Sequence, residues 1–566
     1  SGWTSSNSTD WDGDGCIDAA DWVSSFVYNT TSSSYLDDTI VDIEVAANGD
    51  IVVMGYFFNN ITIGNFVLQS QGESDVFFAK LDANGTVIWA KSAGSIYDER
   101  FDSHSNNENG IEIEGGLSID SSGNIFATGS FCVDVGNTNN WACSASFGNL
   151  SISGAGYGSE KGGLFVTKLS ANGTWLWVNK ATSGGATRGA EIVADSSGDA
   201  YVTGGTCTYA GNNGCTATFG NYTISASSNT QSRAFVAKIS SSGNWEMLTT
   251  SSNGVWGMGT KIELTSTGDI VIIGWRKAGA ISFNGTAAQG LVSGGDFGVF
   301  VAKFNSYGAL QWVETIYRSC PSWISTTHCN SLYSRPGGLT LDGEDNIFVS
   351  GSLKGYAAFD YSSPVTWNSG CNPQSSTCEY EIFVLKIYSN GTVQWAAETQ
   401  RASLPSSNAV NHLSQRDHAS SILVDGDVIT IGGTVGKCNY YCSTGTSFGS
   451  FTPNSDYGGD IFFATLSNST GAWLSVETVQ ASNRQDVYAM VDPPNHDLMV
   501  AGRTHGNMTI GLTSLVVGNC SSNTGPIACD YTPFLSFYLE EDLDDDNDGL
   551  NDTLDSCARG DLNWTA

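Results

Sequence analysis

Short runs in which apolar and polar residues alternate fill the chain, and Gly, Ser, Asn and Asp separate them. Alternation with a period of two is the pattern of a half-buried β-strand, and N-G or S-G between two such runs indicates a hairpin turn. Helical periodicity is almost absent. The pattern therefore predicts an all-β protein.

One strand–turn–strand pattern recurs along the chain. In residues 41–55 it reads VDIEVAANGDIVVMG, with an apolar run, a D/N-rich turn, a second apolar run and a final glycine. Seven copies, of which the last two are weaker, end at Gly55, Gly129, Gly204, Gly274, Gly351, Gly432 and Gly502. Their regular spacing is typical of a repeat architecture.

A second pattern follows the first six of these glycines after a variable insert. In residues 75–89 it reads DVFFAKLDANGTVIW, which predicts a second hairpin. Its tryptophans are Trp89, Trp177, Trp245, Trp312, Trp395 and Trp473, and its lysines are Lys80, Lys168, Lys238, Lys303 and Lys386. We expect the tryptophans to pack between repeat units and the lysines to pair with a neighbouring Asp or to cover a strand edge.

Each unit is thus predicted to be a four-stranded antiparallel sheet, which cannot bury both faces alone. Seven such sheets arranged radially bury each other, so we predict a seven-bladed β-propeller. The D-x-x-G-N/D turns with their closing glycine resemble the SBBP-type β-propeller repeats of secreted prokaryotic proteins, over about residues 36–540. This resemblance implies a fold and a surface location but no activity.

The seventh unit lacks its fourth strand. Its third strand, residues 533–542, has neither the Lys nor the hairpin to a Trp-bearing strand, whereas residues 19–29 (AADWVSSFVYN) provide a candidate that contains Trp22. We expect this N-terminal strand to close the last blade, from the same molecule or from a neighbouring one. The predicted organisation is a calcium segment at 1–18, a propeller at 19–540 and a second calcium segment at 541–566.

Two segments fit the pattern D-x-D-x-D-G-x-x-D-x-x-D, which wraps oxygen ligands around one Ca²⁺. The expected ligands in the first are Asp10, Asp12, Asp14, the backbone carbonyl of Cys16, Asp18 and Asp21. Those in the second are Asp544, Asp546, Asp548, the carbonyl of Leu550, Asp552 and Asp555. Acidic runs are usually solvated linkers, but two complete matches favour calcium.

Both loops carry Asp at position 12 and lack flanking helices, and they look like thrombospondin type 3 or dockerin-type calcium loops. Joined tail to head, the two ends of the chain read as acidic loop, Cys557, spacer, acidic loop, Cys16. That order is the arrangement of tandem thrombospondin type 3 repeats, here split between the termini.

The cysteines divide into local pairs and one remaining pair. The close neighbours are Cys132 with Cys143, Cys207 with Cys215, Cys320 with Cys329, Cys371 with Cys378, Cys438 with Cys442 and Cys520 with Cys529. Cys16 and Cys557 remain, and they bond either within one molecule or between consecutive molecules. A contact between consecutive molecules is head to tail and produces a filament unless its rotation closes.

The composition indicates where the protein is located and which partners are excluded. Fourteen cysteines indicate an oxidising, extracellular location, and the net charge of −34 argues against nucleic acid or an anionic membrane surface as partner. No apolar stretch is long enough for a spanning helix, and the N-terminus does not resemble a signal peptide, so we expect a processed form or part of a longer chain.

Catalytic patterns are weak. The six histidines have no metal-binding spacing, and no G-x-S-x-G elbow or phosphate loop occurs. Quinoprotein dehydrogenases share the hairpin style, but the Cys-Cys pair that they use is absent. Sialidases also differ in the spacing of their Trp. The hairpin tips carry N-x-T sequences, and the candidates for N-glycosylation are Asn84, Asn172, Asn284 and Asn390.

We therefore predict a non-enzymatic, extracellular structural protein that binds calcium and assembles head to tail into a filament or surface layer. An alternative is an adhesion or ligand-binding module of a larger surface protein, with surface glycans among its candidate partners. A polysaccharide-active enzyme is less favoured, because no carboxylate pair can be placed. A buried Asp/Glu pair with perturbed pKa values at the mouth of the axial channel would favour it.

Overall fold

The computed structural model describes residues 21–27, 29–30, 38–97, 115–133, 141–156, 162–208, 214–226, 232–252, 254–277, 279–288, 297–319, 332–359, 365–369, 380–401, 417–436, 446–453, 459–479, 485–493, 498–504, 508–510, 513–515 and 532–539. Within these ranges the regular elements are β-strands, which confirms the predicted all-β class. No helix capable of crossing a bilayer is found in the described part of the chain.

The main strands form four-stranded antiparallel sheets, each named here after its first strand. The first three are β3 (Thr39–Val45), β4 (Ile51–Ile63), β5 (Phe66–Leu81) and β6 (Val87–Ala93); β7 (Gly116–Ile119), β8 (Ile125–Phe131), β11 (Gly163–Leu169) and β12 (Trp175–Ser183); and β13 (Ala186–Ala194), β14 (Ala200–Thr208), β17 (Arg233–Ile239) and β18 (Trp245–Thr250).

The next sheets continue the same order. They are β19 (Trp256–Leu264), β20 (Ile270–Lys277), β23 (Phe297–Phe304) and β24 (Leu310–Thr315); β26 (Tyr333–Leu341), β27 (Ile347–Phe359), β29 (Glu381–Ile387) and β30 (Val393–Glu398); β32 (His418–Asp425), β33 (Val428–Val435), β35 (Asp460–Ser467) and β36 (Trp473–Val479); and β37 (Gln485–Val491), β38 (Leu498–Thr504) and β41 (Thr532–Leu539) with β1 (Asp21–Val27).

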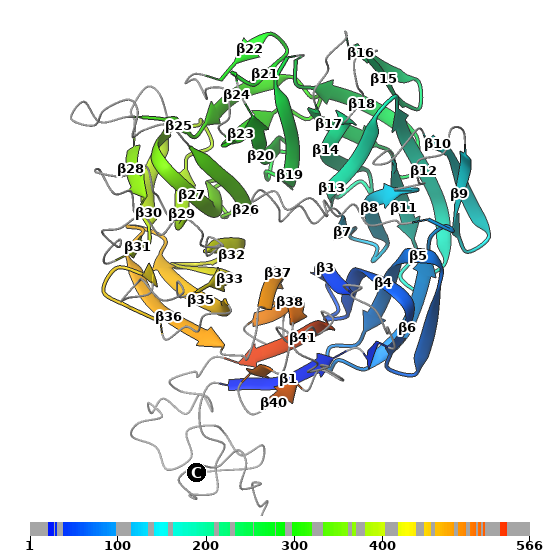
Figure 1. Ribbon diagram of the computed structural model, residues 1–566, viewed down its shortest axis with the longest axis horizontal. Helices are drawn as coiled ribbons and strands as arrows, with labels where there is room; N and C mark the ends of the chain where they lie inside the picture. The colour runs from blue at the N-terminus through cyan, green and yellow to red at the C-terminus, as the bar shows by residue number, and fades with distance from the viewer. Residues whose placement is uncertain are drawn as a thin grey trace, which may run out of the picture.

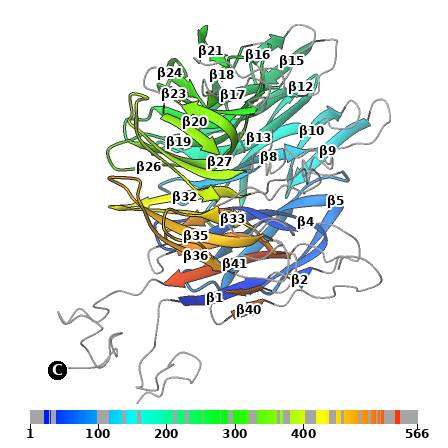
Figure 2. The same cartoon turned by 60° about the vertical axis from the view of Figure 1, so that its left-hand side comes forward.

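The sheets stand around a common axis, with the first strand of each sheet innermost (Figure 1). Neighbouring first strands contact each other in the order β3, β7, β13, β19, β26, β32, β37 and back to β3. Figure 2 shows the same arrangement from the side, with the sheets stacked face against face. The architecture is therefore a β-propeller.

The repeat glycines lie in the second strand of each sheet, at positions where a side chain has no room. A Cβ at Gly274 would lie 2.1 Å from the carbonyl oxygen of Met258 and 2.7 Å from the ring of Phe300. Phe300 comes from the third strand of the same sheet and is fully buried. The glycine therefore lets the aromatic ring of the second repeat pattern lie flat against the sheet.

Both ends of the chain contribute to one sheet. β1, from the N-terminal region, pairs antiparallel with β41, with Asp21 opposite Leu539 and Val27 opposite Phe534. β41 in turn pairs with β38, so β1 is the outermost strand of the β37 sheet. This is the strand that the sequence analysis expected to close the last blade.

A tryptophan on the outer strand of one sheet binds the hairpin turn of the next sheet, and we call this contact the tryptophan latch. Trp312, on the outer strand β24, donates a hydrogen bond from Nε1 to the carbonyl of Ser389, 3.0 Å away in the hairpin turn of the β26 sheet. Gly391 of that turn has φ +93° and lies against the Trp312 ring, where a Cβ would be 3.0 Å from Cδ2. The same donor–acceptor pairs are Trp89–Ala171, Trp177–Ser241 and Trp395–Asn468.

The tryptophan series divides into two groups that differ in their distance from the hairpin glycine. Trp245 and Trp473 stand two residues after the hairpin glycine, whereas the latch tryptophans stand four residues after it. Their rings pack edge-to-face on Phe219 and Phe448, in the inserts of their own repeat units. Trp245 also donates to the carbonyl of Lys180 in the preceding sheet, at 3.3 Å. Trp473 belongs to an apolar cluster that also contains Ile382 and Ala397 of the β26 sheet, so the expected contact between sheets is confirmed for this series.

The repeated lysines pair with the Asp of the turn between the first two strands of their own sheet, as expected. Lys80 Nζ lies 2.8 Å from Asp50 and also donates to the carbonyl of Ala171, 3.3 Å away in the next sheet. The equivalent pairs are Lys168–Asp120 (3.1 Å), Lys238–Asp199 (2.7 Å), Lys303–Asp269 (3.4 Å) and Lys386–Asp342 (3.7 Å). Each lysine therefore closes a turn beside the junction with the next sheet.

The inserts between second and third strands reach back to the preceding sheet. The hairpin of β15 (Cys215–Phe219) and β16 (Tyr222–Ala226) belongs to the unit of β13, yet β15 pairs with β12. The hairpin of β9 (Trp141–Phe147) and β10 (Leu150–Gly156) meets the end of the β3 sheet through the Gly94–Ser146 bridge. The inserts therefore reinforce the same junctions as the tryptophan latches.

Further short strands complete the description. They are β2 (Asn29–Thr30), β21 (Ser282–Phe283), β22 (Thr286–Ala287), β25 (Tyr317–Arg318), β28 (Val365–Ser369), β31 (Gln400–Arg401), β34 (Thr446–Ser447), β39 (Met508–Ile510) and β40 (Thr513–Leu515). Of these, β25 pairs with β27 of the following unit and β31 pairs with β34 of the following insert.

Two of the predicted disulfides fix inserts to their sheets. Cys132 is bonded to Cys143 and Cys207 to Cys215, and these cysteines are buried. Cys132 and Cys207 lie at the ends of the second strands β8 and β14, in the left-handed region (φ +59° and +61°). Each disulfide therefore ties its insert to the end of a second strand.

The other four predicted local disulfides lie outside the described residues. They are the pair of Cys320 and Cys329, the pair of Cys371 and Cys378, the pair of Cys438 and Cys442, and the pair of Cys520 and Cys529. Their bonding is not tested by this structure and stays a prediction.

The latch can be tested at Trp312. Trp312→Ala should lower the free energy of unfolding by about 2–4 kcal/mol, because it removes a large packed side chain. Trp312→Phe keeps an aromatic ring and loses the bond to Ser389, so it should lose only about 1 kcal/mol. Denaturant unfolding measures both, and Tyr307→Ala, at an exposed neighbouring position, serves as control. A Trp312→Phe variant as stable as the wild type would contradict a contribution from the hydrogen bond to Ser389, and equal effects of the Ala and Phe variants would contradict the packing contribution.

The insert disulfide can be tested by the double change Cys207→Ala and Cys215→Ala. Opening a loop of this length should lower the free energy of unfolding by about 2–3 kcal/mol. Thermal unfolding of the oxidised wild type and the variant measures the difference. Reduction of the wild type with a thiol should move its midpoint toward that of the variant. If the variant is as stable as the oxidised protein, the disulfide does not constrain the insert.

Candidate functional site

The inner strands present matched layers of side chains to the propeller axis. Most of them carry a β-bulge at the same point, as between Ile40 and Asp42 or between Gly259 and Lys261. The residues that follow the bulge in the register of the first two strands form one layer: Asp42, Glu191, Lys261, Ser421 and Ala489. Gly116 begins β7 opposite Thr128, and Gly338 lies within the bulge of β26. The layer two residues further contains Glu44 and Glu263.

Carboxylates gather on one side of this channel. They line a cavity of about 230 Å³ together with Lys261. Lys261 Nζ lies 2.5 Å from Glu191 Oε2, and Asp42 accepts hydrogen bonds from the backbone N–H groups of Leu117 (2.6 Å) and Ile43 (2.9 Å). The other positions of this layer are small residues, and a Cβ at Gly116 would lie 1.8 Å from Glu191 Oε1, so the glycine leaves room for the carboxylate.

Burial shifts the pKa values of the whole acidic group upward. It raises the pKa of Glu191 to about 8, although the charge of Lys261 opposes the shift, and that of Glu263 to about 7. The pKa values of Asp42 and Glu44 are also raised by burial. Burial alone would lower the pKa of Lys261, but the charges of Glu191 and Asp42 raise it, so the ammonium form is retained.

The contacts of this cluster show what it does for the fold. Asp42 ties β3 to β7 through Leu117, Glu191 ties β13 to β19 through Lys261, and the Ser118 hydroxyl accepts a bond from the Ala194 N–H. Such bonds connect neighbouring inner strands around the axis. Within the described ranges, no group of three or more His, Cys, Asp or Glu side chains has a geometry that holds a metal ion.

The carboxylates of this cluster are also the kind of group that a polysaccharide-active enzyme would need. The sequence analysis found no carboxylate pair, whereas the structure brings Asp42, Glu191 and Glu263 together in the channel with raised pKa values. The signal was present in the sequence as the column of residues just before each D-x-x-G turn. Only the register across distant repeats shows that these positions face one another.

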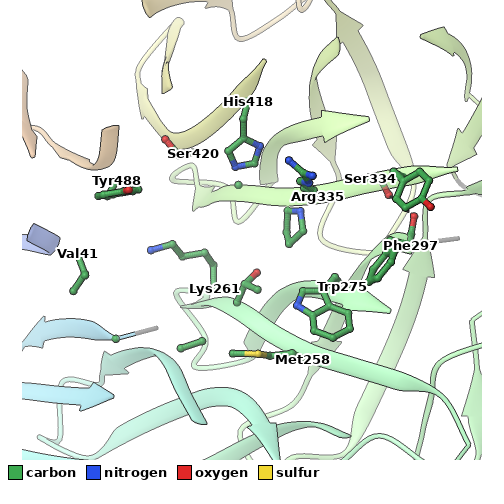
Figure 3. Close-up of a pocket in the computed structure, with 16 residues that line it drawn as sticks. Val41, Met258, Lys261, Trp275, Phe297, Ser334, Arg335, His418, Ser420 and Tyr488 are labelled. Carbon is green, nitrogen blue, oxygen red and sulfur yellow. Dashed lines mark hydrogen bonds between the residues drawn. The ribbon is translucent and has the colours of Figure 1, made fainter. Parts of the chain in front are cut away.

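A second cavity of about 100 Å³ lies at the other end of the same inner strands. Figure 3 shows His418 and Arg335 across the open space from Met258 and Trp275, with Lys261 extending toward Val41 and Tyr488. The complete lining comprises Val41, Gly115, Ala190, Met258, Thr260, Lys261, Trp275, Phe297, Tyr333, Ser334, Arg335, Pro336, Gly337, His418, Ser420 and Tyr488. We call this the axial cavity. Lys261, Ser420 and Tyr488 line both cavities.

Aromatic rings form one wall of the axial cavity. Phe297 stacks on Tyr333 with ring centroids 5.8 Å apart, and Trp275 packs on Phe297 at 5.9 Å. Lys277 Nζ lies 4.8 Å from the centre of the Phe297 ring. Ligand-binding cavities are commonly lined by aromatic side chains together with a few polar or charged groups.

The polar groups of the axial cavity are held in place. Arg335 stacks on Tyr380 at 4.4 Å and donates from Nη2 to the Tyr380 hydroxyl at 3.1 Å. His418 is buried beside Ser352, whose hydroxyl lies 3.1 Å from Nδ1. Burial, with the added charge of Arg335, lowers the pKa of His418 to about 3, so the imidazole is neutral at physiological pH.

The predicted calcium ligands are not tested by this structure. Asp10, Asp12, Asp14, Cys16 and Asp18 lie outside the described residues, as do Asp544, Asp546, Asp548, Leu550, Asp552, Asp555 and Cys557. Asp21 is described only as the first residue of β1. Calcium binding therefore stays a prediction.

The candidate glycosylation sites, Asn84 among them, all lie on exposed turns. In Asn172 the side-chain oxygen accepts a hydrogen bond from the Thr174 hydroxyl at 2.9 Å, and in Asn390 it accepts one from the Thr392 N–H at 3.0 Å. Asn284 instead donates from its amide nitrogen to Gly308 O at 3.3 Å. Exposure makes these side chains accessible, and their modification stays a prediction.

Comparison with known proteins gives no family. No family model matches the chain, and no curated protein sequence matches it. Among solved structures, the quinohemoprotein alcohol dehydrogenase of Comamonas testosteroni covers 90% of this chain and 76% of its own, with 10% identity and a TM-score of 0.30. A mutant of the Synechocystis apocarotenoid oxygenase covers 89% and 97%, with 9% identity and a TM-score of 0.35.

A third match is a GH43_12 protein retrieved from capybara gut metagenome, which covers 92% of this chain and 99% of its own, with 9% identity and a TM-score of 0.25. At this identity the likeness is one of fold alone, and no activity follows from it. The resemblances to SBBP repeats and to thrombospondin type 3 loops have no support from a family match.

The acidic cluster predicts a definite pH dependence of stability. The folded pKa of Glu263, about 7, lies above its ordinary value of 4.5, so folding favours the protonated form. Its stabilising contribution is complete below pH 4.5 and is lost as the pH rises through 7. Glu263→Gln removes this loss. Between pH 5 and pH 8 the variant should gain on the order of 2 kcal/mol relative to the wild type.

Denaturant unfolding at both pH values measures this difference. Glu344→Gln, which removes an exposed carboxylate on the turn of the β26 sheet, is the matched control for the change in net charge. Its stability should follow that of the wild type at both pH values. If Glu263→Gln behaves like Glu344→Gln, burial does not raise the pKa of Glu263.

Proposed function

We propose that this chain is a non-enzymatic, extracellular structural subunit: a seven-bladed propeller, stiffened by calcium at its ends, that assembles head to tail into a filament or surface layer. The propeller fold and the two buried disulfides are the established part of this description, and disulfides persist in oxidising compartments. The calcium, the assembly and the blade count are the proposed part.

One observation carries the proposal, namely the pairing of β1 with β41. Asp21, the last residue of the first calcium pattern, lies opposite Leu539, five residues before the second pattern begins at Asp544. Both calcium segments are therefore attached to the same edge of the same sheet. This supports a joint in which the two segments and their cysteines act together.

The same pairing also suggests how copies connect. β1 is the outermost strand of its sheet, and its partner β41 comes from the other end of the chain. A β1 strand that pairs with β41 of the next molecule would preserve every backbone hydrogen bond while linking the two. Heterologous links of this kind extend as a filament unless the rotation between copies closes a ring.

Two other functions have support from specific observations. The axial cavity, with its aromatic wall and cationic side chains, favours the alternative of a ligand-binding module. The carboxylates with raised pKa values favour an enzyme that acts on polysaccharide. We rank the enzyme below the binding module, because Asp42 and Glu191 already accept hydrogen bonds or an ion pair from neighbouring inner strands.

Assembly is tested with the full chain in calcium and in a chelator, on non-reducing gels and in electron micrographs. We expect a ladder of disulfide-linked multimers and filaments in calcium, and smaller species in the chelator. Cys16→Ser with Cys557→Ser should abolish the ladder. Cys207→Ser with Cys215→Ser is the matched control, because that pair bonds locally, and it should leave the ladder intact.

Only monomers at high protein concentration in calcium would contradict assembly. A ladder that survives loss of Cys16 and Cys557 would contradict their role in the joint. Release of reducing sugar from a polysaccharide that is abolished in Glu263→Gln would instead identify an enzyme, and would overturn the non-enzymatic part of the proposal.

A further inference from the structure

The axial cavity has a charge opposite to that of the protein. The chain carries a net charge of −34, yet the charged side chains among the cavity's lining residues are Lys261 and Arg335, both cationic. His418 is neutral, because burial lowers its pKa to about 3. The carboxylates of the channel lie beyond Lys261, in the other cavity. Both charged side chains that line the cavity can therefore attract a negatively charged group inside it.

An indole donor points to the same ligand chemistry. Trp275 Nε1 is shielded from water and has no hydrogen-bond acceptor within the described part of the chain. A buried N–H without an acceptor costs about 1–3 kcal/mol. Trp275 lines the axial cavity, so a ligand there that carries an acceptor can remove this penalty.

Contacts with neighbouring side chains hold Arg335 and Lys261 in place. Arg335 is fixed by its stacking on Tyr380, which leaves its planar guanidinium in one orientation. Lys261 gives one hydrogen bond to Glu191, and an ammonium group has three donors. An anion in the cavity that reaches both side chains would be attracted by each of them.

The remaining lining is apolar and aromatic. Met258, Trp275, Phe297 and Pro336 present hydrocarbon and ring surface to the space. Inorganic anions would leave this surface in contact with water, whereas an organic anion covers it. A cationic ligand would gain from the rings but would meet Lys261 and Arg335 directly.

We propose that the axial cavity binds a small organic carboxylate with an apolar or aromatic body. The carboxylate accepts hydrogen bonds from Arg335, Lys261 and Trp275 Nε1, and the body packs on Met258, Pro336 and Phe297. The ligand is either a free carboxylic acid or the C-terminal carboxylate of a peptide that ends in an apolar residue. This site is independent of the proposed assembly through the chain ends.

The test is calorimetric titration of the full chain with phenylacetate as probe. We expect saturable binding at one site per chain, and at least tenfold weaker binding of neutral phenylacetamide. A peptide ending in Phe, with a free or an amidated C-terminus, distinguishes the two sources. Tighter binding of the free-acid peptide than of phenylacetate identifies a peptide ligand, and the reverse identifies a small molecule; either outcome supports a carboxylate site.

Variants locate the binding. Arg335→Gln should weaken phenylacetate about 10- to 100-fold, the effect of one charge-assisted hydrogen bond. Trp275→Phe keeps the ring, loses the donor and should weaken binding about 3- to 10-fold. Trp473→Phe, the same substitution on the outer strand β36, is the matched control and should leave binding unchanged. Thermal unfolding checks that each variant is folded.

Three results would overturn the proposal. One is the absence of saturation by phenylacetate and by both peptides. Another is equal or tighter binding of phenylacetamide or of 2-phenylethylammonium, which would mean that charge does not select the ligand. The third is binding that Trp275→Phe and Arg335→Gln leave unchanged, because the carboxylate would then be held elsewhere.

Discussion

The contact between a tryptophan of one sheet and the hairpin turn of the next is the interaction on which the ring depends. Each four-stranded sheet has two apolar faces, and only the neighbouring sheets can cover them. The latch fixes how neighbours meet: Trp312 Nε1 binds the carbonyl of Ser389, and the Gly391 beside it has no side chain to hold the ring away. Lysine–aspartate pairs and insert hairpins lie at the same junctions. Packing, hydrogen bonds and ion pairs therefore all stabilise the contact between neighbouring sheets.

The repeat pattern was sufficient to predict the strands, the turns and the partner of β41, because these depend on local periodicity and on one missing strand. It did not separate two similar patterns that differ in register. Trp473 was grouped with Trp395, whose indole binds the carbonyl of Asn468 in a hairpin turn, yet it stands two residues nearer to its hairpin glycine and packs edge-to-face on Phe448 of the insert. Alternation puts successive side chains on opposite faces of a strand. Which of these faces meets the neighbouring sheet depends on how the strands pair.

The axial residues were missed for a different reason. Asp42, Glu191 and Lys261 are between 70 and 219 residues apart in the chain, and each looks like an ordinary polar position before a turn. They become one cluster because their inner strands have a bulge at the same height, which stacks equivalent positions into a layer. Arg335 and Trp275 likewise come from different sheets. A site to which several repeats each contribute one residue has no local sequence pattern, whereas the predicted calcium loops have one because their expected ligands are close together in the sequence.

The sharing of one sheet by both ends has a consequence for synthesis. β1 ends at Val27 and β41 begins at Thr532, so about 500 residues must be translated after β1 before its partner exists. At roughly 5–20 residues per second, the N-terminal strand waits on the order of 25–100 s without a mate. During that time β1 has no partner strand on the ribosome-bound chain, and the ring can close only after β41 has been made. Closure is thus a late event in the folding of the propeller.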